Sequence, residues 1–200
     1  MDPTPFEIVE RDGAKHASNG AMTLSVLDGD GLAQLTVSDV NNDSWDNCGA
    51  LASKNIKRAD GGAFAQSVYF DCDDAPGFEN VILQVIDQSG NVSTCTTKVT
   101  VLDLEAPVIT CPNGIETVTD EDECTAIVSG INLQDVQDNC DVAIHYSISG
   151  ATTADGSNDA SGTVFNKGTS TVTYIVTDGS GNSSNCSFDV EVEDAQRSEE

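Results

Sequence analysis

The residues with the clearest potential chemistry are oxygen donors packed into short polar runs. Residues 39–47 read Asp-Val-Asn-Asn-Asp-Ser-Trp-Asp-Asn, and residues 87–91 read Asp-Gln-Ser-Gly-Asn. Ca²⁺ is bound by several carboxylate, amide and carbonyl oxygens at once. If the two runs meet at one end of a folded module, they predict a Ca²⁺ site. Its expected ligands are Asp39, Asn42, Asp43, Asp46, Asp87 and Asn91.

The second half of the chain repeats this pattern with fewer donors. Asp103 and Glu105, in the segment that joins the two halves, predict a further cluster that would stiffen the joint. Between them, these residues make Ca²⁺ the one cofactor that the sequence suggests. The ligands expected for the weaker site of the second half are Asp135, Asp138, Asn139, Asp178 and Asn182.

The same residues also have a purely structural interpretation. In Asp-x-x-Gly-Asn the Asp side chain caps the backbone of a tight turn, and Gly and Asn tolerate a positive φ. For Asp87 and Asp178 we favour this turn, while both interpretations stay open. The run at residues 28–31, Asp-Gly-Asp-Gly, is expected to be a plain hairpin turn, because Asp39 stands where the last Glu of an EF-hand loop would fall.

Two landmarks recur about ninety residues apart, which indicates tandem modules of one architecture. The sequence Asp-x-Ser-Gly-Asn, followed by Cys, occupies residues 87–95 and again residues 178–186. The tripeptide Asp-Asn-Cys occurs at residues 46–48 and at residues 138–140. A period of this length suits a self-contained β-sandwich and is too long for a solenoid repeat.

Alternating and β-branched runs dominate both modules, and Gly, Asn, Asp and Ser separate them. For example, Val172, Tyr174 and Val176 fall on one face of a strand, as in a sheet with one buried face. About seven short strands per module predict an all-β fold of two tandem immunoglobulin-like antiparallel β-sandwiches with a short, stiff linker. The expected boundaries are residues 1–103 and 104–194 for the modules and 195–200 for a tail.

The charge of the chain excludes some classes of partner. Eight Lys and Arg stand against thirty-four Asp and Glu, for a net charge of −26. Nucleic acids and anionic membrane surfaces would be repelled, so neither is an expected partner. No apolar run is long enough to span a bilayer, and the chain is not expected to be membrane-embedded. Solubility explains this acidity without any ligand, and Ca²⁺ binding is the more specific explanation.

Seven cysteines in modules of this size favour an oxidising, extracellular or cell-surface location. No Cys-x-x-Cys pair occurs and the two histidines stand far apart, so a zinc site is not expected. The first thirty residues hold no hydrophobic signal core. We therefore expect any secretion signal and any anchor to lie outside this chain.

Five motifs follow one another in the second module: Val108-Ile-Thr-Cys-Pro112, Cys124-Thr-Ala-Ile-Val128, Asp138-Asn-Cys140, residues 172–182 and Cys186-Ser-Phe-Asp-Val190. In this order and spacing they resemble the hyalin repeat (HYR) family over about residues 106–194. Through residues 27–31, 39–49, 70–72 and 87–95, the first module looks like the related repeat that precedes HYR modules in large bacterial surface proteins. The resemblance implies an immunoglobulin-like fold and a role in adhesion or spacing, as in cell-surface adhesins of gliding bacteria. It implies no particular ligand.

The resemblance also implies how the cysteines pair, because the first and last strands of this sandwich type lie side by side. Related first modules carry a cysteine on their opening strand, and this chain has none there, which makes the count odd. The expected disulfides are Cys111–Cys186, Cys124–Cys140 and Cys48–Cys72, with Cys95 left free. Each would contribute about 2–4 kcal/mol to stability. A competing set, Cys48–Cys95 and Cys140–Cys186 with Cys72 left over, stays open, as does the interpretation that some cysteines are buried thiols.

We expect a non-enzymatic adhesion or structural segment of a larger extracellular protein, stiffened by Ca²⁺. Its expected partners are surface glycans or protein receptors, and further modules of the same polypeptide. The alternative is a carbohydrate-binding accessory module of a secreted enzyme, for which an exposed aromatic platform is the usual sign. Aromatic residues make up 5% of the chain, and the candidates are Trp45, Tyr69, Tyr146 and Tyr174. No catalytic motif is recognised, so no enzyme activity is expected.

Overall fold

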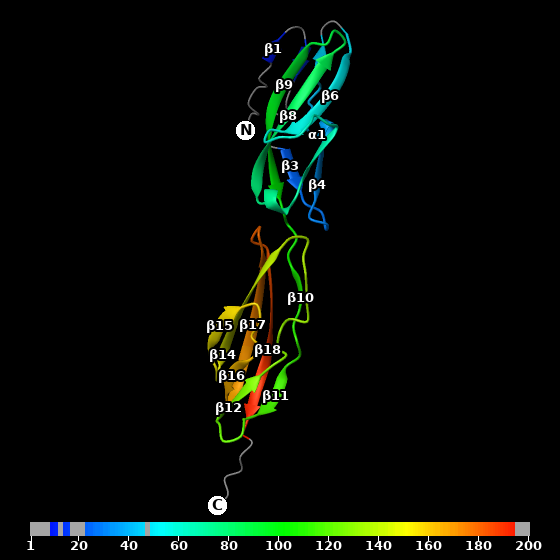
Figure 1. The fold of residues 1–200 in the computed structure, drawn as a ribbon. Helices are drawn as coiled ribbons and strands as arrows, with labels where there is room; N and C mark the ends of the chain where they lie inside the picture. The colour runs from blue at the N-terminus through cyan, green and yellow to red at the C-terminus, as the bar shows by residue number, and fades with distance from the viewer. Residues whose placement is uncertain (1–8, 12–13, 17–22, 47–48, 195–200) are drawn as a thin grey trace, which may run out of the picture. The chain divides into compact units, whose positions relative to one another are not determined.

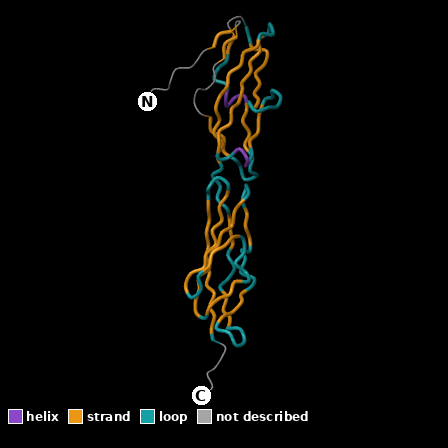
Figure 2. The backbone as a smooth tube through the Cα atoms, turned by 60° about the vertical axis from the view of Figure 1, so that its left-hand side comes forward, coloured by secondary structure: helices purple, strands orange, loops and turns teal. Residues whose placement is uncertain are grey.

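The computed structural model describes residues 9–11, 14–16, 23–46 and 49–194 of the 200-residue chain. The chain divides into two compact units, Met1–Leu104 (unit 1) and Glu105–Glu200 (unit 2), and strands joined by loops build each of them (Figure 1). The helices that are described are short, namely α1 (Val37–Val40) and the 3₁₀ helix η1 (Cys72–Asp74) (Figure 2). The expected all-β class is confirmed. Among the described residues, no helix is long and apolar enough to cross a membrane.

Unit 1 is built from the strands β1 (Val9–Arg11), β2 (Ala14–His16), β3 (Thr23–Val26), β4 (Ala33–Thr36), β5 (Trp45–Asp46), β6 (Leu51–Arg58), β7 (Ser67–Phe70), β8 (Gly77–Asp87) and β9 (Val92–Leu102). The largest sheet has the order β3-β9-β8-β6. Within it, β8 is antiparallel to both of its neighbours, whereas β3 runs parallel to β9. An antiparallel pair, β4–β7, and a sheet of order β1-β2-β5 complete the described part of the unit.

Alternating side chains produce the core of unit 1. Along β8, Val81, Leu83 and Val85 are buried, while the residues between them are half-buried. The β4–β7 pair likewise buries Leu35 and Phe70 and turns their neighbours outward. Burial of apolar surface contributes about 25 cal/mol per Å². The two sheets are therefore held by their apolar inner faces, as in a β-sandwich.

Unit 2 is built from β10 (Val108–Thr110), β11 (Ile115–Val118), β12 (Thr125–Val128), β13 (Asp135–Gln137), β14 (Val142–Gly150), β15 (Ala154–Ser157), β16 (Thr163–Asn166), β17 (Gly168–Asp178) and β18 (Ser183–Glu193). Its main sheet has the order β11-β18-β17-β14-β15, and two smaller antiparallel pairs, β12–β16 and β10–β13, accompany it. As in unit 1, the sheet is antiparallel except for one edge strand, β11, which runs parallel to the last strand, β18.

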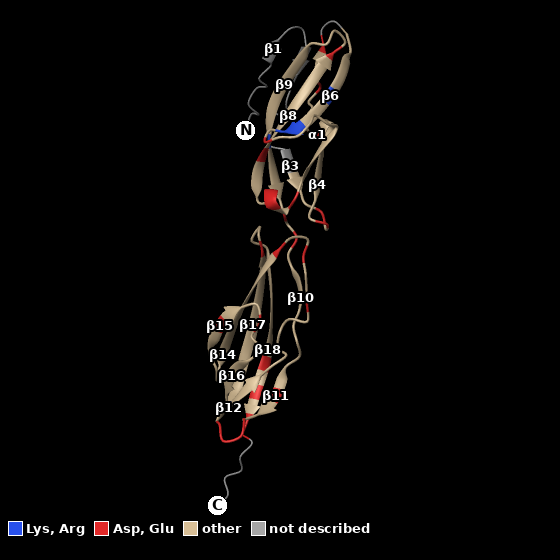
Figure 3. Cartoon of the chain, in the orientation of Figure 1, with Lys and Arg blue, Asp and Glu red and all other residues tan. Residues whose placement is uncertain are grey.

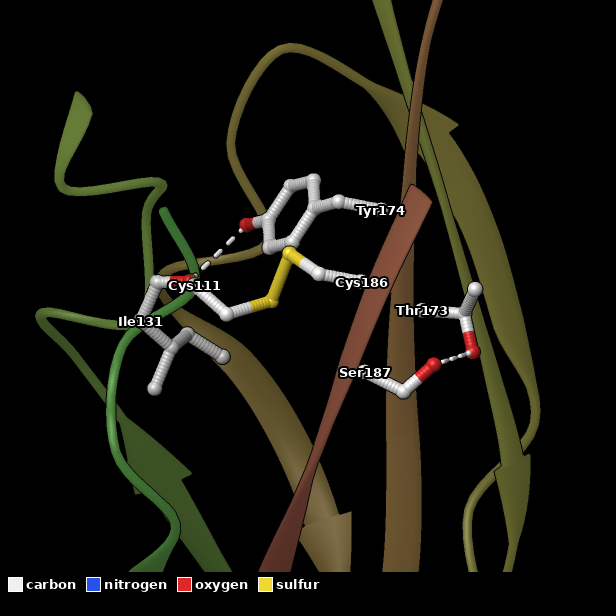
Figure 4. The surroundings of a disulfide bond; sticks show 6 residues. All are labelled: Cys111, Ile131, Thr173, Tyr174, Cys186 and Ser187. Atoms are coloured by element: carbon white, nitrogen blue, oxygen red, sulfur yellow. Dashed lines mark hydrogen bonds between the residues drawn. A yellow bond between two sulfur atoms is a disulfide. The ribbon is translucent and has the colours of Figure 1, made fainter. Parts of the chain in front are cut away.

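The core of unit 2 centres on Tyr174, which is fully buried. Its hydroxyl donates to the carbonyl of Ile131 at 2.9 Å and accepts from the backbone N–H of Ala160 at 2.9 Å, and burial raises its pKa. Val172, Tyr174 and Val176 are all buried on one face, as their alternation predicted. The Cys111–Cys186 disulfide lies beside the Tyr174 ring (Figure 4).

Candidate functional site

The two Asp-x-Ser-Gly-Asn runs form the same tight turn in both units. Asp87 Oδ1 accepts from the backbone N–H groups of Ser89 and Asn91, both at 2.8 Å, and Oδ2 accepts from the Asn91 side chain at 2.7 Å. The bond from the Asn91 side chain is the main cause that holds the pKa of Asp87 below its ordinary value. Gly90 has φ 86°, the left-handed conformation that glycine adopts without strain. The turn interpretation therefore accounts for Asp87 and Asn91.

Asp178 repeats this arrangement. Its Oδ1 accepts from the N–H groups of Ser180 and Asn182 at 2.9 Å, and its Oδ2 accepts from the Asn182 side chain at 2.8 Å. Gly181 has φ 91°. The side chain of Asn182 thus orients the Asp178 carboxylate by hydrogen bonding, as Asn91 does for Asp87.

The loop at residues 39–46 has a structural role at its first acid. Asp39 lies in α1, where its Oδ2 accepts from the N–H and the hydroxyl of Thr36, both at 2.7 Å, and so caps the helix. Asp43 is exposed with φ 52°, and Asp46 lies in β5. Asn42 is half-buried in the loop between α1 and β5. In the described residues, the carboxylates of Asp39, Asp43, Asp46 and Asp87 do not gather in a group of three.

Three aspartates do converge: Asp103, Asp138 and Asp178. Each offers a carboxylate oxygen, and these oxygens lie within 4.8 Å of one another. Asp103 directly follows β9, Asp138 lies between β13 and β14, and Asp178 ends β17. Asp103 and Asp178 are 4% and 7% exposed, and Asp138 is half-buried. We call this set the aspartate cluster.

The aspartate cluster has the chemistry of a site for a hard cation. Three carboxylates this close together repel one another when charged, and a divalent cation would offset that repulsion. Oxygen donors of this type suit Ca²⁺ better than zinc or copper. The sequence assigned Asp103 and the other two aspartates to separate clusters. Glu105, expected beside Asp103, is exposed and is not part of the group.

The cysteines are partly as the sequence predicted. Cys111 and Cys186 form a disulfide with Cα atoms 6.0 Å apart, which is the pairing expected from the resemblance. Cys95 carries a half-buried thiol and is not part of a disulfide. Cys72 is disulfide-bonded. The expected Cys48–Cys72 pair includes Cys48, which lies outside the described residues.

The expected pairing of Cys124 with Cys140 is wrong. Cys124 carries an exposed thiol, whereas Cys140 is disulfide-bonded. The carbonyl of Cys124 accepts from the backbone N–H of Lys167, which directly precedes the first residue of β17. Cys140 lies two residues before Val142, which pairs with Asp178 at the other end of β17. Eleven strand residues span about 30 Å, and a disulfide needs Cα atoms within about 7 Å. The two cysteines thus belong to opposite ends of unit 2.

The four aromatic candidates fall into two groups. Tyr174 is in the core, and Tyr146 packs against it with ring centroids 6.0 Å apart, so neither offers a platform to a ligand. Trp45 is 50% exposed on β5, and Tyr69 is 58% exposed on β7. Of the four candidates, these two rings match the exposed platform expected from the sequence.

The second half of the chain matches a known domain family. Residues 102–192 match the family model of the HYR domain. This segment is an HYR domain. It contains the Cys111–Cys186 disulfide and all three members of the aspartate cluster, and it confirms the resemblance drawn from the sequence motifs.

The chain is also similar to parts of staphylococcal adhesins. It is 36% identical over 120 residues to the serine-rich adhesin for platelets of Staphylococcus aureus strain MRSA252. The aligned stretch covers 58% of this chain and 8% of that protein. The same protein of strain MSSA476 is also 36% identical, over 58% of this chain and 5% of its own length. The chain therefore spans less than a tenth of these relatives.

Solved structures add only distant likenesses. The fibronectin(III)-like modules of Clostridium thermocellum CbhA are 11% identical with a TM-score of 0.36, over 92% of this chain and 96% of that one. Human protocadherin-24 EC1-2 is 14% identical with a TM-score of 0.36, over 93% and 100% of the two chains. With TM-scores below 0.5 these likenesses decide nothing, and the fold rests on the strand order given above.

Proposed function

We propose that this chain is a non-enzymatic adhesion or structural segment of a larger protein displayed outside the cell. The observation that carries the proposal is the disulfide-bonded HYR domain in a chain similar to part of the staphylococcal adhesins. Disulfides persist in oxidising surroundings such as the cell surface. The partners we propose are surface glycans or protein receptors, and the net charge of −26 disfavours nucleic acids.

The proposal includes Ca²⁺ bound by the aspartate cluster. The support for it is the convergence of three carboxylates, two of them buried, from segments that are distant in the sequence. A bound cation would offset the repulsion among these carboxylates and stabilise the folded state.

Adhesion is tested by retention of coated beads under flow. Beads carrying the complete chain are passed over mucin, fibronectin and epithelial cell layers, beside beads carrying albumin or the reduced, alkylated chain. We expect the folded chain to be retained on at least one surface, several-fold above both controls. If retention matches the controls on every surface, adhesion by this chain is wrong and only a spacing role is left.

The accessory-module alternative is favoured by one observation, the exposed ring of Tyr69. Such a module would share glycan binding with an adhesin but would be joined to a catalytic domain. The sequence of the full-length protein distinguishes the two: an array of further repeats supports the adhesin segment, and a hydrolase domain supports the accessory module.

A further inference from the structure

Unit 1 carries a polar groove beside the edge strand β6. It consists of two adjoining hollows of about 470 Å³ and 400 Å³, which share Val37, Lys54 and Gln66. Among the described residues that line it, amide and hydroxyl side chains outnumber apolar ones, one ammonium group is present and no carboxylate is found. The polar side chains that line it are Gln34, Thr36, Ser38, Asn41, Ser53, Lys54, Gln66 and Ser67.

The outer face of the β4–β7 pair extends this groove. Residues of the two strands pair as Gln34 with Tyr69 and Thr36 with Ser67, and these four side chains point away from the core. The Gln34 side chain donates to the Tyr69 hydroxyl at 2.9 Å and holds the exposed ring in place. A flat apolar surface therefore adjoins a row of hydrogen-bonding groups.

The charge of the groove differs from that of the chain. In the view of Figure 3, blue Lys and Arg are seen on unit 1, whereas red Asp and Glu are seen on both units. Lys54 forms no ion pair with any described residue. The nearby carboxylate of Asp39 already accepts two hydrogen bonds from Thr36 in the cap of α1. The ammonium group of Lys54 is thus available to a ligand.

Other cations of unit 1 are engaged elsewhere. Lys57 lies over the ring of Phe64 at 5.2 Å, and Lys98 lies over the ring of Phe78 at 3.6 Å. Arg58 donates to both oxygens of Asp74, at 2.6 and 2.7 Å. These contacts distinguish Lys54 and also provide control variants with the same change of charge.

We propose that this groove binds an acidic oligosaccharide, with an apolar sugar face on Tyr69 and a sugar carboxylate at Lys54. Clustered amides and hydroxyls match the hydroxyl groups of a sugar, an exposed aromatic ring matches its C–H face, and an ammonium forms charge-assisted hydrogen bonds with a carboxylate. The inference rests on the proposed adhesion function and gives it a ligand class. Uronic acids and sialic acids share the required chemistry, which is a carboxylate on a polyhydroxylated ring.

The test is calorimetric titration of the complete chain with trigalacturonic acid, sialyllactose and, as the neutral probe, galactotriose. We expect at least one acidic probe to bind at least tenfold more tightly than the neutral one. Lys54→Gln should weaken that binding about tenfold, the usual effect of losing one charge-assisted contact. Tyr69→Ala should weaken it about as much, because Tyr69 supplies the stacking surface. Lys98→Gln should leave it within twofold, and thermal melts of all variants check folding.

Three results would overturn the inference: no binding of either acidic probe, equal binding of the neutral probe, or an equal loss with Lys98→Gln. The last would mean that the probe responds to the overall charge of the chain and not to the groove.

The bead assay separates this inference from the adhesion proposal. If beads coated with Lys54→Gln or Tyr69→Ala are retained like wild type, adhesion stands and the groove is not its site. If titration succeeds while no bead is retained, the groove binds sugar and the adhesion proposal fails.

Discussion

Replacing Asp138 by Asn should stabilise unit 2 in EDTA and remove most of the stabilisation that Ca²⁺ gives. The oxygens of the aspartate cluster lie within 4.8 Å of one another. Two unit charges at that distance repel by about 3–4 kcal/mol at an effective dielectric constant of about 20, and solvent lowers this repulsion at the half-buried Asp138. In EDTA, removal of one charge should therefore raise the melting temperature above that of wild type.

In Ca²⁺ the wild type should gain stability that the variant does not gain. Extracellular Ca²⁺ modules have dissociation constants of about 10⁻⁴ to 10⁻³ M. With a dissociation constant of about 0.1 mM, 1 mM CaCl₂ would stabilise the folded state by about 1.4 kcal/mol, or about 6–11 °C for a unit of this size. Asn at position 138 can still accept the hydrogen bond from the N–H of Cys140, now 2.9 Å long, but it lacks the charge, so most of this shift should disappear.

Differential scanning calorimetry of the complete chain in EDTA and in CaCl₂ measures both effects. Asp155→Asn is the matched control, because Asp155 is an exposed acid on β15 and is not part of the cluster. Identical melting curves of the wild type in the two buffers would refute the reasoning. A Ca²⁺ shift that Asp155→Asn reduces as much as Asp138→Asn would refute it too.

Three further predictions concern the cysteines and the turns. Replacing Cys111 and Cys186 together by Ala should cost about 4 kcal/mol, because their disulfide closes a loop of 75 residues; urea denaturation measures this, and a loss below about 1 kcal/mol would speak against the bond. Cys124 should react with a maleimide in the folded chain, since its thiol is exposed, and peptide mapping that finds it bonded to Cys140 would contradict the structure. Hydrogen bonds, above all from the Asn91 side chain, hold the pKa of Asp87 below its ordinary value, so their stabilisation is complete above the unfolded pKa of about 4 and is lost as pH falls through the lower folded pKa. Asp87→Asn should flatten the pH dependence of the melting temperature in that acidic window, and an unchanged profile would show that this turn does not couple to folding.

The periodic features of the chain were readable from the sequence because they depend on local geometry. The alternation at Val172, Tyr174 and Val176 predicted their common buried face, and the repeat predicted that Asp87 and Asp178 have equivalent places. Helix α1 was missed, although Thr36 and Asp39 form a capping pair at the spacing that begins a helix. Its acid was instead interpreted as a metal ligand.

Non-local geometry could not be predicted in this way. Cys124 and Cys140 are close in the sequence, but β17 separates their neighbourhoods by its full length, and sequence spacing carries no information on which end a loop occupies. The aspartate cluster shows the converse case. Asp103 directly follows β9, Asp138 lies between β13 and β14, and Asp178 ends β17, and the spacing of these residues in the sequence does not show that their oxygens lie close together.

The equivalent turns distinguish a role that Asp87 and Asp178 share, which is to cap the turn, from a role proposed for Asp178 alone, which is to bind a cation. Asp87 and Asp178 accept the same three hydrogen bonds at nearly the same distances, so the turn by itself explains why an aspartate stands at both positions. Among the described residues, two further carboxylates join Asp178 and none joins Asp87 in such a group. A carboxylate has about four acceptor sites, so three hydrogen bonds leave about one for a cation. The turn therefore holds the Asp178 carboxylate in a fixed direction before any ion arrives, which lowers the cost of ordering that a flexible ligand would add to binding.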